Sequence, residues 1–65
     1  MQHIKISHQR ATAIRKAEGL PMPDLNGSVL LKTGAKLIRS FGTADLRWHI
    51  SGYADDGSDV APYHI

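Results

Sequence analysis

The chain has 65 residues, of which 42% are hydrophobic, a formal net charge of +2 and no cysteine. This length allows one small domain, residues 1–65, and the hydrophobic content excludes a disordered chain. No disulfide or thiolate metal site can form, no apolar run is long enough to span a membrane, and the first ten residues lack the apolar segment of a secretory signal. We therefore predict a cytoplasmic protein with no membrane partner.

The charged residues are unevenly distributed along the chain. Residues 1–44 carry a net charge of +5, whereas residues 45–65 carry −3. Such asymmetry predicts a bipolar surface. The basic part could contact phosphate or an acidic protein surface, and the acidic part argues against a uniform coat of nucleic acid.

The N-terminal residues predict a strand followed by a helix. In residues 3–7, HIKIS, two isoleucines alternate with polar residues, which is the pattern of a short strand. Ser7 is a typical N-cap for a helix over residues 8–18, and Gly19 suits the position just after its end. Residues 20–28, LPMPDLNGS, contain two prolines and Asn26-Gly27, so we expect a loop there.

Residues 28–41 allow two interpretations. A single helix would have an apolar face that consists of Leu30, Leu37, Ile38 and Phe41. Gly34 inside such a helix would cost about 1 kcal/mol relative to alanine. Alternatively, residues 28–32 form a strand, Thr33 is an N-cap and the helix covers residues 34–41. We favour the single helix.

The C-terminal residues predict a β-hairpin. Residues 46–51, LRWHIS, alternate between apolar and polar, residues 55–58 form a turn, and residues 59–65 return as an edge strand because Pro62 has no N–H to donate. The expected fold class is α+β, with a small antiparallel sheet of the short N-terminal strand and the C-terminal hairpin, packed against one or two helices. The expected core consists of Leu30, Leu37, Ile38, Phe41, Leu46, Trp48 and Ile50.

No pattern in the sequence indicates catalysis or a bound metal. The four histidines, at positions 3, 8, 49 and 64, lack the spacing of zinc motifs. The segment DDGSD lacks the acidic spacing of an EF-hand loop, and neither a nucleophile elbow nor a phosphate-binding glycine loop occurs. We therefore expect no catalytic residue, no cofactor, no metal site and no enzymatic activity.

Two candidate binding surfaces follow from the charged and aromatic residues. A helix over residues 28–41 would align several cations on one face, to which the helix over residues 8–18 would add others. This basic surface consists of Lys32, Lys36, Arg39, Arg10, Arg15 and Lys16. Two tyrosines flank the acidic turn, and tyrosines are common anchors of protein interfaces. This acidic and aromatic hairpin tip consists of Tyr53, Asp55, Asp56, Asp59 and Tyr63.

Residues 29–42, VLLKTGAKLIRSFG, resemble the LLKxGAxKLxxxFG stretch of some phage-encoded proteins found near DNA recombination functions. Those proteins more often have proline at the position of Thr33 and an acidic residue between Ala35 and Lys36. The resemblance implies a phage or prophage origin and transfers no catalytic residue. In size and lack of cysteine the chain is also similar, in general character, to small phage-encoded inhibitors such as anti-CRISPR proteins.

We therefore expect a small, phage-encoded, non-enzymatic binding protein. It would bind stoichiometrically to a protein or nucleoprotein partner, such as a host defence complex, and inhibit that partner. The alternative is a protein that binds nucleic acid directly through the basic helix face. An exposed edge strand would also allow a homodimer.

Overall fold

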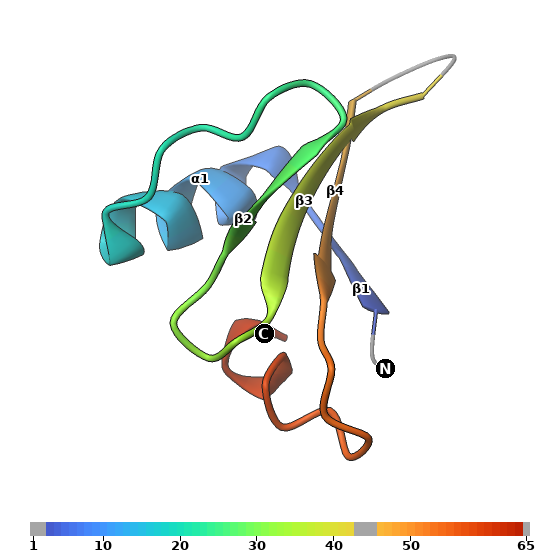
Figure 1. Cartoon of the computed structure of the whole chain (residues 1–65). Helices are drawn as coiled ribbons and strands as arrows, with labels where there is room; N and C mark the ends of the chain where they lie inside the picture. The colour runs from blue at the N-terminus through green and yellow to red at the C-terminus, as the bar shows by residue number, and fades with distance from the viewer. Residues whose placement is uncertain (1–2, 43–45, 65) are drawn as a thin grey trace.

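The described part of the chain combines a four-stranded antiparallel sheet with one α-helix and a short 3-10 helix (Figure 1). A computed structural model describes residues 3–42 and 46–64. The elements are β1 (His3–Ile6), α1 (His8–Glu18), β2 (Gly27–Leu30), β3 (Lys36–Phe41), β4 (Leu46–Ser51) and the 3-10 helix η1 (Ala61–Tyr63). The strands lie in the order β1-β4-β3-β2. The predicted α+β class, with an antiparallel sheet packed against a helix, is confirmed.

The first strand and the helix lie where the sequence predicts them. Ser7 caps α1, because its hydroxyl oxygen accepts a hydrogen bond from the backbone N–H of Arg10 at 3.1 Å. Gly19 follows the helix with a φ of 66°, and its N–H donates to the carbonyl of Lys16 at 3.2 Å. Glycine adopts this left-handed conformation without strain, so α1 ends there.

Residues 28–41 form a strand, a turn and a second strand, so the prediction of a helix in this segment is wrong. Only the strand of the second interpretation is correct, and it covers residues 28–30 as part of β2. Gly34 has a φ of 97°, and its N–H donates to the carbonyl of Leu31 at 3.0 Å. The glycine that is costly inside a helix therefore makes the turn between β2 and β3.

The predicted C-terminal hairpin is also wrong in its second strand. β4 pairs with β3 in the register Leu37↔Ile50, and with β1 in the register Ile4↔Ile50. Both edges of β4 are thus occupied. Described residues of the segment 59–65 form turns and η1, with Pro62 in the first turn of η1, where its missing N–H costs no hydrogen bond; Ile65 lies outside the described residues.

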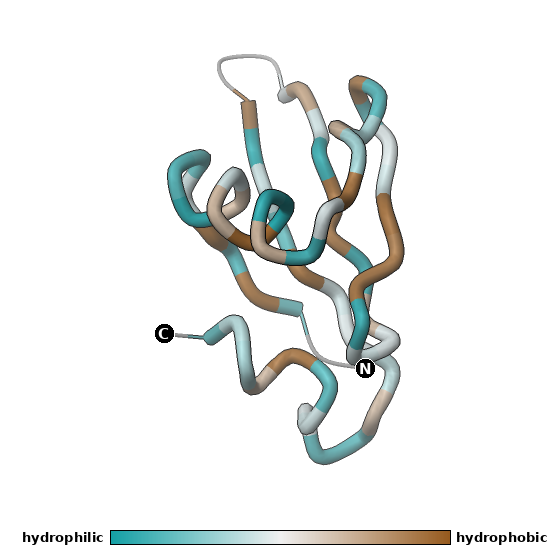
Figure 2. Tube along the Cα trace, turned by 90° about the vertical axis from the view of Figure 1, so that its left-hand side faces the viewer, coloured by the Kyte–Doolittle hydropathy of each residue, from teal (hydrophilic) through white to brown (hydrophobic). Residues whose placement is uncertain are grey.

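The core lies between one face of the sheet and the layer formed by α1 and η1. In Figure 2 the hydrophobic stretches of the strands pass behind the helix. The buried side chains are Ala11, Ile14, Leu31, Ala35, Leu37, Trp48, Ile50, Val60 and Tyr63. Of the predicted core residues, Leu30 and Phe41 are 62% and 57% exposed, so their assignment to the core is wrong. The strand register places Leu30 on the opposite face of the sheet, and Phe41 lies at the end of β3.

Candidate functional site

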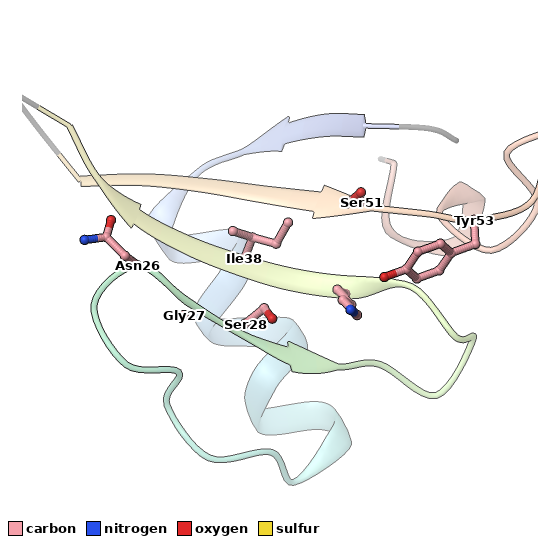
Figure 3. A pocket seen from close by; sticks show the side chains of 7 residues that line it. Asn26, Gly27, Ser28, Ile38, Ser51 and Tyr53 are labelled. Atoms are coloured by element: carbon pink, nitrogen blue, oxygen red, sulfur yellow. The ribbon is translucent and has the colours of Figure 1, made fainter.

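The second face of the sheet points away from α1, and within the described residues no helix or strand covers it (Figure 3). We call it the open face. Residues that are paired across neighbouring strands point to the same side, and the register therefore assigns the open face. It consists of His3, Lys5, Ser28, Leu30, Lys36, Ile38, Ser40, Arg47, His49 and Ser51.

The open face is basic. Lys5 of β1, Lys36 of β3 and Arg47 of β4 are exposed, and none of the described strand residues on this face is acidic. Two histidines lie among these cations, with the ring centres of His3 and His49 4.8 Å apart. Three strands that are distant in sequence therefore bring their positive groups onto one surface.

His49 lies in the centre of this surface and responds to it. Its pKa is lowered from 6.5, first because burial disfavours the charged ring, and then because of the positive charges of His3, Lys5 and Arg47. The Nδ1 atom of His49 is buried and has no hydrogen-bond partner. His49 is therefore predominantly neutral at pH 7, and the positive potential comes mainly from the lysines and the arginine.

A shallow pocket of about 310 Å³ lies on the open face and crosses β2, β3 and the end of β4. Figure 3 shows Asn26 at one end and Tyr53 at the other, with Ile38 and Ser28 between them. Lys36 and Ser51 complete its lining. Ile38 contributes a half-buried apolar surface, and the serines and the asparagine amide contribute hydrogen-bonding groups.

Tyr53 is the aromatic wall of this pocket, and its ring is anchored from two sides. The residue is 51% exposed, and the ammonium group of Lys36 lies 5.4 Å from the centre of its ring. The backbone N–H of Tyr53 donates a hydrogen bond to the carboxylate of Asp59. The ring is thus held at the edge of the basic surface while part of it remains accessible to solvent.

The cations that the sequence predicts to share a helix face are separated in the structure. Lys36 lies on the open face, but Arg39 lies on the opposite face, where its guanidinium group is 5.9 Å from the ring of Trp48 and donates to the carbonyl of Pro23 at 3.2 Å. Lys32 lies in the turn between β2 and β3. The shared face is therefore wrong, because a strand alternates its side chains and a helix does not. The other predicted basic residues, Arg10, Arg15 and Lys16, belong to α1 on the far side of the sheet.

The residues of the predicted acidic and aromatic tip are also separated. Asp55 and Asp56 are exposed in a turn beyond β4. Asp56 accepts a hydrogen bond from the N–H of Ser58 at 2.9 Å, and this bond lowers the pKa of its carboxyl group. Tyr63 is only 8% exposed, so it contributes to the core rather than to an exposed tip. Tyr53 is the one aromatic residue of this set that stays exposed.

The predicted binding surfaces omit His3, Lys5, Arg47 and His49, although the sequence contains their signal. Residues 3–7 and 46–51 both alternate, and in both the polar face carries cations or histidine. The missing information was that β1 and β4 are neighbours, with Lys5 opposite His49. Pairing between segments so distant in sequence cannot be read from the local pattern.

Neither a metal site nor a membrane span is found in residues 3–42 and 46–64. No three histidine, aspartate or glutamate side chains gather there in a way that could hold a metal ion. The helices of this part of the chain are too short and too polar to cross a membrane. Comparisons with protein-family models, with curated proteins and with solved structures find no match to the chain.

Proposed function

We propose that this chain binds nucleic acid through the open face of its sheet. The observation that carries the proposal is the gathering of Lys5, Lys36 and Arg47 on one uncovered surface, without an acidic residue among the described strand positions. Flexible cations of this kind neutralise phosphates and supply most of the sequence-independent affinity for nucleic acid. The face extends about 20 Å along β3 and β4, which is enough for several phosphates.

The rest of the molecule supports this choice of face. The other layer, formed by α1 and η1, covers the core, and its cation Arg15 is partly used in a hydrogen bond to the carbonyl of Leu20 at 3.4 Å. The acidic turn with Asp55 and Asp56 follows β4 and lies at one end of the sheet (Figure 1). It would repel phosphate there and favour binding along β1, β4 and β3.

The test compares two double variants with the same loss of charge. Lys5→Gln/Lys36→Gln removes two exposed lysines from the open face, and Lys16→Gln/Lys32→Gln removes two exposed lysines from elsewhere. The anisotropy of labelled oligonucleotides is measured at about 50 and about 200 mM salt. The open-face variant should bind more weakly and lose up to about 0.7 of salt slope per lost phosphate contact on a single strand. Equal losses in both variants, or no binding by the wild type at the lower salt, would contradict the proposal.

Protein binding is the second candidate, and exposed apolar side chains favour it. Leu25 and Phe41 are 53% and 57% exposed. They lie at the same end of the sheet, because the backbone N–H of Phe41 donates to the side chain of Asn26 at 3.0 Å. Exposed apolar groups of this size often mark a protein contact. A partner bound there should be lost in Leu25→Ser/Phe41→Ser, whereas oligonucleotide binding by the open face should not change.

A further inference from the structure

The pocket between Asn26 and Tyr53 differs in chemistry from the basic surface beside it. A phosphate site needs converging cations or N–H groups, but this pocket contains a single cation, Lys36, and is floored by Ile38. Its volume of about 310 Å³ is at the small end of the range for small-molecule sites. A flat, partly apolar ligand with hydrogen-bonding edges would match this lining better than a phosphate.

The electrostatics at Tyr53 also disfavour phosphate. The carboxylate of Asp59 accepts the hydrogen bond from the backbone N–H of Tyr53, and two exposed aspartates follow in the next turn. A phosphate placed against the tyrosine ring would therefore be repelled by nearby carboxylates. A neutral base would not be repelled, and it could stack on an aromatic ring.

We propose that this pocket holds one unpaired nucleobase stacked on Tyr53, so that the chain prefers single-stranded over double-stranded nucleic acid. The proposal rests on the proposed function, because the cations of the open face must hold the backbone while the base enters the pocket. Ser28 and Asn26 lie at the far side from the tyrosine, where they can donate to the polar edge of the base. A base inside a duplex is stacked and paired, so it cannot reach Tyr53.

The test uses Tyr53→Leu, which removes the ring, and Tyr53→Phe, which keeps it. Tyr53 is half exposed, so both variants should fold, and the fluorescence of Trp48 checks this. The probes are a labelled thymidine oligonucleotide of about ten nucleotides and a duplex of the same length. Tyr53→Leu should weaken binding of the single strand by about 5- to 150-fold, whereas Tyr53→Phe should retain most of the affinity. Neither variant should change binding of the duplex.

A fluorescent base gives a second measurement. An oligonucleotide that contains 2-aminopurine should be quenched on binding to the wild type and to Tyr53→Phe, but much less on binding to Tyr53→Leu at saturation. The salt slope should be the same for all three proteins, because stacking on Tyr53 releases no counterion.

The failure of this inference can be distinguished from the failure of the proposed function. Equal affinity for single strand and duplex, unchanged by Tyr53→Leu and still weakened by Lys5→Gln/Lys36→Gln, would overturn the base pocket and leave the basic surface intact. The absence of binding to either probe at about 50 mM salt would overturn both proposals.

Discussion

The indole N–H of Trp48 donates a hydrogen bond to Nδ1 of His8 at 3.0 Å, which connects β4 to the first turn of α1. The two rings lie 5.7 Å apart at a tilt of 53°. Trp48 is only 2% exposed, so the imidazole supplies the hydrogen-bond acceptor that solvent cannot. This contact holds the helix against the sheet on the side opposite to the open face.

Replacing His8 should therefore destabilise the fold. His8→Ala leaves a buried indole N–H without an acceptor, and we expect the free energy of unfolding to fall by about 1–3 kcal/mol. His8→Asn places an amide oxygen near the position of Nδ1 and should recover part of the loss. Urea unfolding followed by the fluorescence of Trp48, the one tryptophan of the chain, measures both. Equal midpoints for His8→Ala and the wild type would show that the bond contributes nothing to stability.

Gly52 should not tolerate a side chain. A Cβ atom at this position would lie 2.4 Å from Oδ1 of Asp59 and 2.7 Å from a methyl group of Val60. Because Val60 is buried, Gly52→Ala should cost about 1–3 kcal/mol through overpacking. The exposed Ala61→Ser serves as a control in the same part of the chain and should leave the thermal midpoint almost unchanged.

The lowered pKa of His49 predicts a loss of stability in acid. The unfolded chain takes up a proton at this residue near pH 6.5, whereas the folded chain resists it until a lower pH. The contribution of His49 is therefore fully present above pH 6.5 and is lost as the pH falls through the folded pKa. Denaturant midpoints measured from pH 7.5 to pH 4.5 should fall less steeply in His49→Gln than in the wild type. Parallel profiles for the two proteins would contradict this assignment.

The opposite sign holds for Tyr63 at alkaline pH. Burial, and then the hydrogen bond to the Glu18 carboxylate at 2.7 Å and the charge of that carboxylate, raise the pKa of Tyr63 above 10.0, against a smaller opposing effect of Thr33. Its contribution to stability is present below pH 10.0 and is lost as the pH rises through the folded pKa. Tyr63→Phe should remove this alkaline loss, and it should cost about 0.5–1.5 kcal/mol at pH 7 through the missing hydrogen bond. Stability curves at pH 7 and pH 11 for both proteins provide the measurement.

Local signals were sufficient for the first third of the fold. Ser7 and Gly19 fixed both ends of α1, and alternation identified β1 and β4. The helix expected in residues 28–41 failed because two apolar side chains, Leu30 and Ile38, lie on the open face and disguise the alternation of β2 and β3. A helical spacing of apolar residues was the result. The positive φ of Gly34, which decides between the two structures, is not visible in a hydrophobic pattern.

The candidate site was predictable in its chemistry but not in its place. Sequence reasoning selected Lys36 and Tyr53, and both line the pocket of the open face. It grouped Lys36 with Arg39, which a strand sends to the opposite side, and it grouped Tyr53 with the buried Tyr63. Lys5 joins the site only through the pairing of β1 with β4, and no local rule predicts that pairing.

The position of β1 beside β4 has a consequence for the order in which the chain folds. β2, β3 and β4 are consecutive and can pair through short connections, but β1 must find β4 across almost the whole sequence, as in the pair Ile6↔Trp48. Closing so long a loop costs more chain entropy than closing a hairpin, so we expect β1 to dock after the other three strands. A weakened β1, as in Ile4→Ala, should then unfold faster while its refolding rate changes little. Late docking of β1 would also make the basic surface complete only in the last step of folding.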